Sequence, residues 1–430
     1  MGYDKMLSML NTQQNIVIIG LGPTGLAMAI EACKKDALRR NVIAITDREQ
    51  YTREAIFRLD VDILPYLAEL VGQDKMDHYF ERKLIGPKES LNGWDFHIIQ
   101  MKTLEQLLYE TLIALPNIEV LCLPKRSKCH IKNIDSDNHS VTVVQHLNTG
   151  ATERVIGFKY LIAADGPSHN TVNRVVGDNI IYETTQLPQI HKKHARATYK
   201  LPAELCADTF RPLFLPVNTP IPDLRSLQNL GWTLNSSPEI RAFVVDGVLF
   251  AAAECPEQLD NDIDKIDLWM QTVLGLICTQ SINALTRVDA AIFDVSLTEA
   301  NRTVIPLPGK NKALNTPNDE VAYLFPVGDA LRNTHYQTGS GAVVGLQEAR
   351  VFGTYLESTQ TLSDIETYHA QISEVRAANR MRVDNFITKR TEREINATAL
   401  AKSMSAVLAP IPIQNMNASS STDDLLMRIN

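Results

Sequence analysis

A glycine-rich turn near the N-terminus has the residue types and the spacing needed to bind a pyrophosphate. It reads Gly20-Leu21-Gly22-Pro23-Thr24-Gly25, after the apolar run 16–19 and before a helical pattern that continues to Lys35. In such a turn, the first glycine permits the bend, the second lets the backbone approach the phosphates, and the third allows helix and strand to pack closely. The start of the helix adds N–H groups and a partial positive charge. The turn therefore predicts a dinucleotide site.

An acidic residue supports this interpretation. Asp47 follows Gly25 by 22 residues and comes directly after a second apolar run, Val42 to Thr46. At the end of the second strand of a βαβ unit, a carboxylate can accept hydrogen bonds from both hydroxyl groups of a ribose. The alternative is a glycine-rich turn without a ligand, and the combination of strand, helix and Asp47 weighs against it.

Two later segments also end an apolar run with glycine and aspartate. The first is Leu161-Ile162-Ala163-Ala164-Asp165-Gly166, for which an ordinary Asp-Gly turn is the alternative. The second leads from Leu324 through Gly328-Asp329-Ala330 to Gly339-Ser340-Gly341 at the start of a helix. Asp329 could accept a hydrogen bond from a ribityl hydroxyl, and the N–H groups of this helix start could face the pyrimidine edge of a flavin. Here a plain turn and helix start is the alternative.

In this order and at these positions, the three segments resemble those of the class A FAD-dependent monooxygenases, which have the p-hydroxybenzoate hydroxylase fold. The resemblance covers roughly residues 15 to 360. The likeness is greatest to the monooxygenase domain of MICAL proteins, as seen in Asp47-Arg48, in Tyr51-Thr52-Arg53, in 164–171, and in Gly328–Leu331 followed by Thr338–Gly341.

The resemblance implies which residues bind FAD outside the glycine-rich turn. Lys102 stands where the family usually has an arginine ahead of its helix, and surface charge is the alternative for Lys102 and Arg53. The implied set is Asp47, Arg48, Arg53, Lys102, Asp165, Gly166, Gly328, Asp329, Thr338, Gly339 and Gly341.

The chain also departs from the family pattern. Ser168 comes early, and Val172 stands where an arginine is often found. After Gly328-Asp329, the run His335-Tyr336-Gln337-Thr338 replaces a proline-containing loop over the flavin. The loop match places His335 and Tyr336 near the ring, so they are the candidate catalytic residues. A surface position is the alternative for His335.

The pattern of apolar runs predicts the elements that position these residues. The first 47 residues make a βαβ unit, so we expect an α/β fold with a Rossmann-like FAD-binding domain of the GR2 type. A β-rich substrate domain would be inserted, and helices would follow, one starting at a capping box Ser363–Glu366. The expected boundaries are 1–186 and 308–360 for the FAD-binding domain, 187–307 for the β-rich domain, 361–409 for the C-terminal helices and 410–430 for a flexible tail.

Composition excludes several classes of function. The net charge of -8 and the pI near 5.7 provide no basic field for nucleic acid. No apolar stretch approaches the length of a membrane span, and the N-terminus lacks the features of a secretory signal. Six scattered cysteines show neither a CxxC pair nor metal-ligand spacing. We therefore expect a cytoplasmic protein with reduced thiols and no metal.

These observations predict an NAD(P)H-driven FAD monooxygenase, in which NADPH or NADH reduces the flavin and oxygen then reacts. The single dinucleotide fingerprint agrees with a family that has no separate nicotinamide domain. One alternative is an FAD-dependent reductase or dehydrogenase. Another is a flavin-binding regulatory protein whose C-terminal helices, with the basic run 380–393, engage a protein partner. The substrate would be a small molecule or a protein side chain, and the MICAL likeness raises protein methionine or actin.

Overall fold

The computed structural model describes most of the chain. Tyr336, Thr338, Gly339 and the expected tail at 410–430 lie outside the described residues. The described ranges are 15–53, 55–91, 94–123, 130–147, 150–177, 180–185, 187, 192–202, 224–245, 247–277, 285–309, 321–335 and 340–407.

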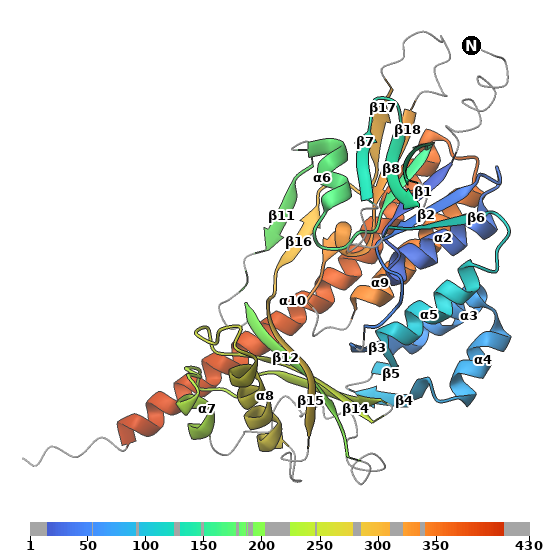
Figure 1. Ribbon diagram of the computed structural model, residues 1–430. Helices are drawn as coiled ribbons and strands as arrows, with labels where there is room; N and C mark the ends of the chain where they lie inside the picture. Colours follow the sequence, from blue (N-terminus) through green and yellow to red (C-terminus); the bar gives the residue numbers. More distant parts are fainter. Residues whose placement is uncertain are drawn as a thin grey trace, which may run out of the picture.

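The larger of the two structural units of the chain is built around a six-stranded sheet (Figure 1). Its strand order is β17-β18-β10-β1-β2-β6, and all neighbours are parallel except the edge strand β17. The apolar runs that predicted these strands are buried, as expected for strands covered on both faces. The strands are β1 (Ile16–Ile19), β2 (Val42–Thr46), β6 (Ile118–Cys122), β10 (Tyr160–Ala163), β17 (Ile305–Pro308) and β18 (Val321–Pro326). The predicted α/β fold is confirmed.

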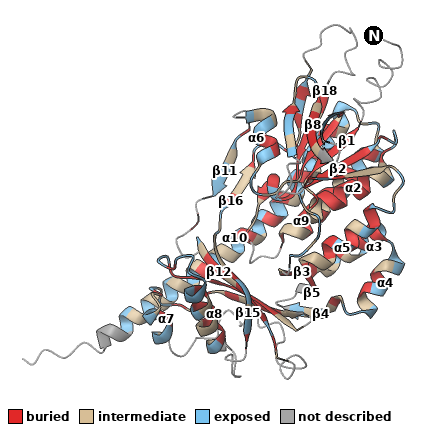
Figure 2. Cartoon of the chain, viewed as in Figure 1, coloured by how far each residue is buried: buried red, intermediate tan, exposed pale blue. Residues whose placement is uncertain are grey.

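Helices and a small sheet complete the core of this unit. Helix α2 (Pro23–Lys35) packs on α5 (Met101–Leu112) and on α9 (Gly341–Glu357). The sheet formed by β7 (His130–Asp135), β8 (Ser140–Leu147) and β9 (Gly150–Gly157) contributes side chains to the same buried cluster. Figure 2 shows the burial concentrated along the central strands and these helices.

The β-rich unit has its own core. Strands β13 (Ile240–Val245), β14 (Val248–Glu254), β12 (Lys193–Lys200) and β15 (Thr286–Asp294) form an antiparallel sheet in that order. Helix α8 (Ile263–Ile277) packs on one face, where Trp269 is completely buried. The predicted β-rich insertion is therefore present. Residues 305–307, which we expected in it, instead belong to β17 of the main sheet, because they pair with β18.

A third sheet lies between the two units and was not predicted. It consists of β3 (Ile56–Asp60), β5 (Trp94–Gln100) and β4 (Ile85–Leu91), and helices α3 (Leu64–Val71) and α4 (Gln73–Glu81) accompany it. One of its faces shares the core of the larger unit, and the other packs on the β-rich sheet. A smaller sheet joins β11 (Tyr182–Thr185), β16 (Leu297–Ala300) and β19 (Arg332–Asn333).

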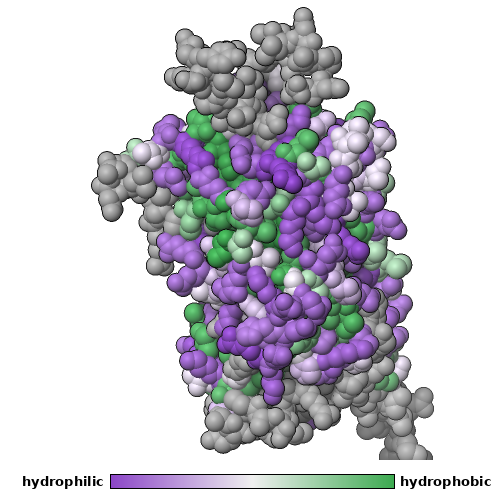
Figure 3. All heavy atoms as spheres, turned by 90° about the vertical axis from the view of Figure 1, so that its right-hand side faces the viewer, coloured by the Kyte–Doolittle hydropathy of each residue, from purple (hydrophilic) through white to green (hydrophobic). Residues whose placement is uncertain are grey.

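The C-terminal region is one helix, α10 (Leu362–Val407), which runs along both units (Figure 1). The predicted capping box at Ser363 and Glu366 is wrong. The carboxylate of Asp364 accepts the N–H of Thr361 at 2.8 Å, so the cap lies two residues earlier. No helix in the described part of the chain combines the length and the apolar character that crossing a bilayer requires. On the face shown in Figure 3, hydrophilic and apolar side chains are interspersed.

Candidate cofactor and active site

The glycine-rich turn joins the end of β1 to the start of α2. Gly20 has a φ of +96°, and a Cβ atom there would lie 2.4 Å from the carbonyl oxygen of Ala164. A Cβ atom on Gly25 would lie 1.9 Å from the carbonyl oxygen of Gly20. On Gly22, its nearest neighbour would be Nη2 of Arg53 at 3.6 Å, an ordinary contact. Packing therefore requires Gly20 and Gly25, whereas Gly22 leaves open the space through which a phosphate would approach.

The first N–H groups of α2 are available to an anion. The helix begins at Pro23, without a side-chain hydrogen bond at its cap and without an acidic residue in its first turn. The Thr24 side chain faces the protein, because Cβ atoms on Gly328 and Gly345 would lie 2.8 Å and 1.9 Å from its Oγ1. What Thr24 can offer a phosphate is thus its backbone N–H.

Two arginines beside this turn are held by one buried carboxylate. Glu105 on α5 is completely buried and pairs with Nη1 of Arg48 at 2.8 Å and with Nη2 of Arg53. The side chains of Arg48 and Arg53 stay 36% and 43% exposed, so each is paired with Glu105 and still accessible to a ligand. Asp47 precedes them, exposed at the end of β2. Sequence reasoning missed Glu105, although a charged residue among the leucines of α5 was a detectable signal.

The start of α5 is joined to the segment that carries Arg53. The N–H of Lys102 donates to the carbonyl oxygen of Arg53 at 2.9 Å, which places Lys102 beside the predicted site. Gln100, the residue that precedes α5, is 1% exposed, and its Nε2 has no hydrogen-bond partner in the described part of the chain. A buried amide donor without a partner is costly. Gln100 was not among the predicted site residues.

Asp165 accepts a hydrogen bond from the protein backbone through one of its carboxylate oxygens. Its Oδ2 accepts the N–H of Thr171 at 2.7 Å, in the first turn of α6 (Asn170–Val176). Its Oδ1 is buried and has no partner among the described residues. Its Cα would lie 2.8 Å from a Cβ on Gly20, so the second predicted segment does meet the first. Gly166 has a φ of +82° and open space around it.

Asp329 comes directly after Gly328, in the turn that follows β18. The residue is exposed to water, yet surrounding protein atoms raise the pKa of its carboxyl group, and the guanidinium of Arg53 opposes this rise. A Cβ on Gly341 would lie 3.8 Å from its Oδ1. The structure thus brings Asp329 and Gly341, at the start of α9, into the region of Arg53 and Gly22.

A second buried carboxylate supports the turn before Asp329. The N–H of Gly328 donates to Oε2 of Glu348 at 2.6 Å. Glu348 is completely buried on α9, and this burial raises its pKa to about 7. Gly328 has a φ of +57°, a backbone conformation that favours glycine, and Glu348 satisfies its N–H group. Sequence reasoning did not identify Glu348.

His335 lies in the interior and not on the surface. Its ring is completely buried, 5.6 Å from the ring of His194 on β12 and 5.0 Å from that of Phe386 on α10, measured between centroids. The larger unit, the β-rich unit and α10 therefore meet at His335. This position is compatible with a role at the junction of the two units, and the predicted catalytic role stays a prediction.

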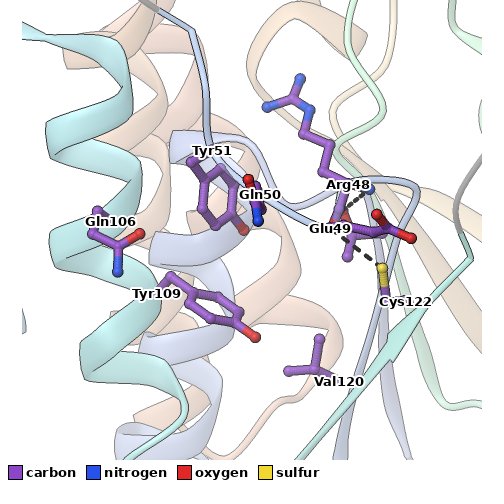
Figure 4. A pocket seen from close by; sticks show the side chains of 9 residues that line it. Arg48, Glu49, Gln50, Tyr51, Gln106, Tyr109, Val120 and Cys122 are labelled. Atoms are coloured by element: carbon purple, nitrogen blue, oxygen red, sulfur yellow. Dashed lines mark hydrogen bonds between the residues drawn. The ribbon is translucent and has the colours of Figure 1, made fainter.

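A pocket of about 300 Å³ opens beside Arg48 (Figure 4). The rings of Tyr51 and Tyr109 lie on one side of it, 5.5 Å apart between centroids. On the other side, the exposed thiol of Cys122 donates to the carbonyl oxygen of Arg48 at 3.3 Å. Asp47 lies in the chain between Thr46 and Arg48, which both line this pocket. The described part of the chain holds no cluster of three His, Cys, Asp or Glu side chains suited to a metal.

Solved structures with this fold support the assignment of the architecture. The chain is similar to p-nitrophenol 4-monooxygenase from Pseudomonas putida DLL-E4, with a TM-score of 0.58, 13% identity and 90% and 93% of the two chains covered. It is similar to anhydrotetracycline hydroxylase OxyS from Streptomyces rimosus, with a TM-score of 0.58, 16% identity and 92% and 73% covered.

A third solved structure shares the fold. It is the Diels-Alderase PyrE3 of pyrroindomycin biosynthesis, with a TM-score of 0.59, 14% identity and 92% and 76% of the two chains covered. No protein-family model matches the sequence, and no curated protein matches it. The p-hydroxybenzoate hydroxylase-like fold predicted from the sequence is confirmed, while the particular likeness to MICAL proteins stays a prediction.

Proposed function

We propose that this protein is an FAD-dependent monooxygenase that takes its electrons from NADPH or NADH. The observation that carries the proposal is the convergence of Gly22, the uncapped start of α2, Arg53 and Asp329 on one region. Phosphates, ribityl hydroxyls and a flavin ring require donors and acceptors of these kinds. The shared fold with a p-nitrophenol monooxygenase and an anhydrotetracycline hydroxylase supports it.

Each residue then has a specific task. The N–H groups of α2 and the guanidinium of Arg53 would hold the pyrophosphate, and Asp47 would accept hydrogen bonds from the ribose. Asp329 would accept one from the ribityl chain, which favours its ionised form in spite of its raised pKa. The start of α9 at Gly341 would place N–H donors at the flavin. Bound FAD would supply hydride transfer and oxygen chemistry, while the protein provides position and field.

We further propose that the β-rich unit, built around strands β12 to β15 and helix α8, covers the cofactor and contributes the substrate pocket. The substrate is a small molecule or a protein side chain. Arg380, Arg390 and Arg393 of the basic run form ion pairs within the chain, so this run is no longer an independent reason to expect a protein partner. A partner would have to use other parts of α10, such as the exposed side chains of Met381 and Ile395.

A second candidate function is that of an enzyme with the same fold that does not oxygenate its substrate. PyrE3 is a Diels-Alderase, and its structure is as similar to this chain as those of the hydroxylases. The run 335–338 departs from the family loop in its residue types. Oxygen consumption coupled to a hydroxylated product would exclude this candidate and the reductase alternative.

Two neighbouring glycines provide the decisive experiment. In the Gly22→Ala variant, the new methyl group makes only ordinary protein contacts but occupies the phosphate approach, so we expect normal melting of the apo protein and loss of FAD binding. Gly25→Ala should lower the melting temperature itself, because its Cβ would overlap Gly20. Anaerobic visible spectra before and after NADPH or NADH would measure bound flavin and its reduction. Equal FAD affinity in wild type and Gly22→Ala would contradict the proposal.

A further inference from the structure

The buried carboxylate of Glu348 on α9 uses only one of its two oxygens in hydrogen bonding. Its Oε2 accepts the N–H of Gly328 at 2.6 Å. Its Oε1 is also buried and has no hydrogen-bond partner in the described part of the chain. An ionised oxygen without a donor is costly in the interior, whereas a protonated oxygen has no charge to solvate. Oε1 of Glu348 is therefore a position at which the protein can hold a proton.

Helix α10 brings two further polar side chains to this carboxylate. Tyr368 packs its ring 6.4 Å from that of Phe352, which lies one turn from Glu348 on α9, measured between centroids. Arg376 follows Tyr368 by eight residues, so the two share one face of α10. The hydroxyl of Tyr368 and Nε of Arg376 are buried and have no hydrogen-bond partner among the described residues either. Glu348 therefore faces a hydroxyl group and a guanidinium in a water-poor environment.

Burial is the largest influence on Glu348 and raises its pKa to about 7. The cations Arg376 of α10 and Arg332 of β19 lower this pKa, and Asp329 of the short helix Gly328–Ala330 raises it. Two other elements pack on α9. Their ionisable groups are Glu31 and Lys35 of α2, which lie against Gly353, and the exposed Asp62 of the short helix Val61–Ile63. The charges that act on Glu348 thus include one carboxylate that belongs to the proposed cofactor site.

Gly328 connects Glu348 to the glycine-rich turn. Its N–H reaches Glu348, and a Cβ atom on Gly328 would lie 2.8 Å from Oγ1 of Thr24. Thr24 is the second residue of α2, in the turn whose N–H groups would hold a pyrophosphate. Gly345, three residues before Glu348, touches the same Oγ1. A negative charge held at the start of α2 would therefore act on Glu348 through closely packed protein, where electrostatic interactions are stronger than in water.

We propose that Glu348 takes up a proton from the solvent when FAD binds. This inference rests on the proposed function, which places the two negative charges of the FAD pyrophosphate at the start of α2. Nearby negative charge favours the neutral form of a carboxyl group. A buffer acid gives up the proton and an O–H bond forms at Oε1, while Oε2 keeps the N–H of Gly328. The neutral Glu348 no longer repels the pyrophosphate, so FAD binds more tightly as the pH falls through 7.

Isothermal titration of FAD into the full-length protein freed of FAD measures this proton directly. The titration is carried out in buffers with different ionisation enthalpies, because the observed heat then varies with the number of protons taken up. A group with a pKa of about 7 is half protonated at pH 7, so complete protonation takes up about half a proton per FAD. At about pH 5, Glu348 is already protonated, and its contribution should vanish.

Glu348→Gln keeps an oxygen that can accept the N–H of Gly328 but cannot titrate. We expect this variant to bind FAD and to lose the uptake seen at pH 7. The matched control is Glu31→Gln. Glu31 is also a buried carboxylate with a raised pKa, held by the hydroxyl of Tyr66 at 2.8 Å, but it lies against Gly353, two turns along α9 from Gly345. This variant should keep the uptake of the wild type.

Two results would overturn the inference and leave the FAD function intact. They are FAD binding without proton uptake in the wild type at pH 7, and equal uptake in the wild type and Glu348→Gln. If FAD does not bind to the wild type at all, the proposed function and the inference both fail. If Glu348→Gln does not fold, the wild type still decides, because its uptake must be present at pH 7 and lost at about pH 5.

Discussion

Thr24 and Gly345 touch where α2 crosses α9, at a point without room for a methyl group. A Cβ on Gly345 would lie 1.9 Å from Oγ1 and 3.0 Å from Cβ of Thr24. Because α2 carries the glycine-rich turn and α9 begins at the predicted flavin-facing glycines, this contact sets the spacing between two parts of the proposed site. The close approach depends on a residue of each helix, Thr24 on α2 and Gly345 on α9.

We expect Gly345→Ala to push the helices apart, lower stability by roughly 1–3 kcal/mol and weaken FAD binding. Thermal melting and FAD titration would measure both effects. The double variant Thr24→Ala/Gly345→Ala removes Oγ1 and should recover part of the loss, since the remaining Cβ atoms would be 3.0 Å apart. If Gly345→Ala lowers the stability by the same amount with and without Thr24→Ala, the steric explanation is refuted.

Glu105→Gln should weaken FAD binding about tenfold or more. The carboxylate orients Arg48 and Arg53, and a neutral amide would release both guanidiniums. FAD affinity is measured by quenching of flavin fluorescence. Glu110→Gln is the control, because Glu110 lies on the same helix but is exposed. If Glu105→Gln and Glu110→Gln bind FAD with similar affinities, Glu105 is not required to orient the two arginines.

Glu348 should make stability depend on pH. Its pKa is raised from 4.5 to about 7 in the folded protein, so the folded state binds the additional proton between these values. The resulting stabilisation is complete below pH ~4.5 and is lost as the pH rises through about 7, which amounts to roughly 3 kcal/mol. Glu348→Gln removes the titrating group. The difference in unfolding free energy between wild type and variant should therefore change over this window, and a flat difference from pH 4 to 8 would disprove the assignment.

Arg390→Met should destabilise the contact between α10 and the β-rich unit by roughly 3–5 kcal/mol, because it leaves the buried Glu254 without its cation. The double variant Glu254→Leu/Arg390→Met should regain much of the loss. Differential scanning calorimetry would follow the transition. Arg196→Met, whose partner Asp289 is exposed, serves as control and should have little effect. If Arg390→Met melts like the wild type, α10 is held by other contacts.

Much of the larger α/β unit could be predicted from the sequence because its signals are local. The bend at Gly20, the close packing at Gly25 and the short buried strands depend on residues that are neighbours in the chain. The aspartates after the strands were predicted for the same reason, because each comes at the end of an apolar run. The capping box on α10 was placed two residues late because two overlapping patterns compete there and only the backbone selects one.

The sequence by itself determined the α/β fold, the glycine-rich turn and the order of the three segments. Tertiary structure alone decided that Glu105 holds Arg48 and Arg53, that Glu348 supports Gly328, and that His335 is buried against His194. The physical reason is that periodicity and turn chemistry act over a few residues, whereas a buried charge finds its partner only when distant segments pack together.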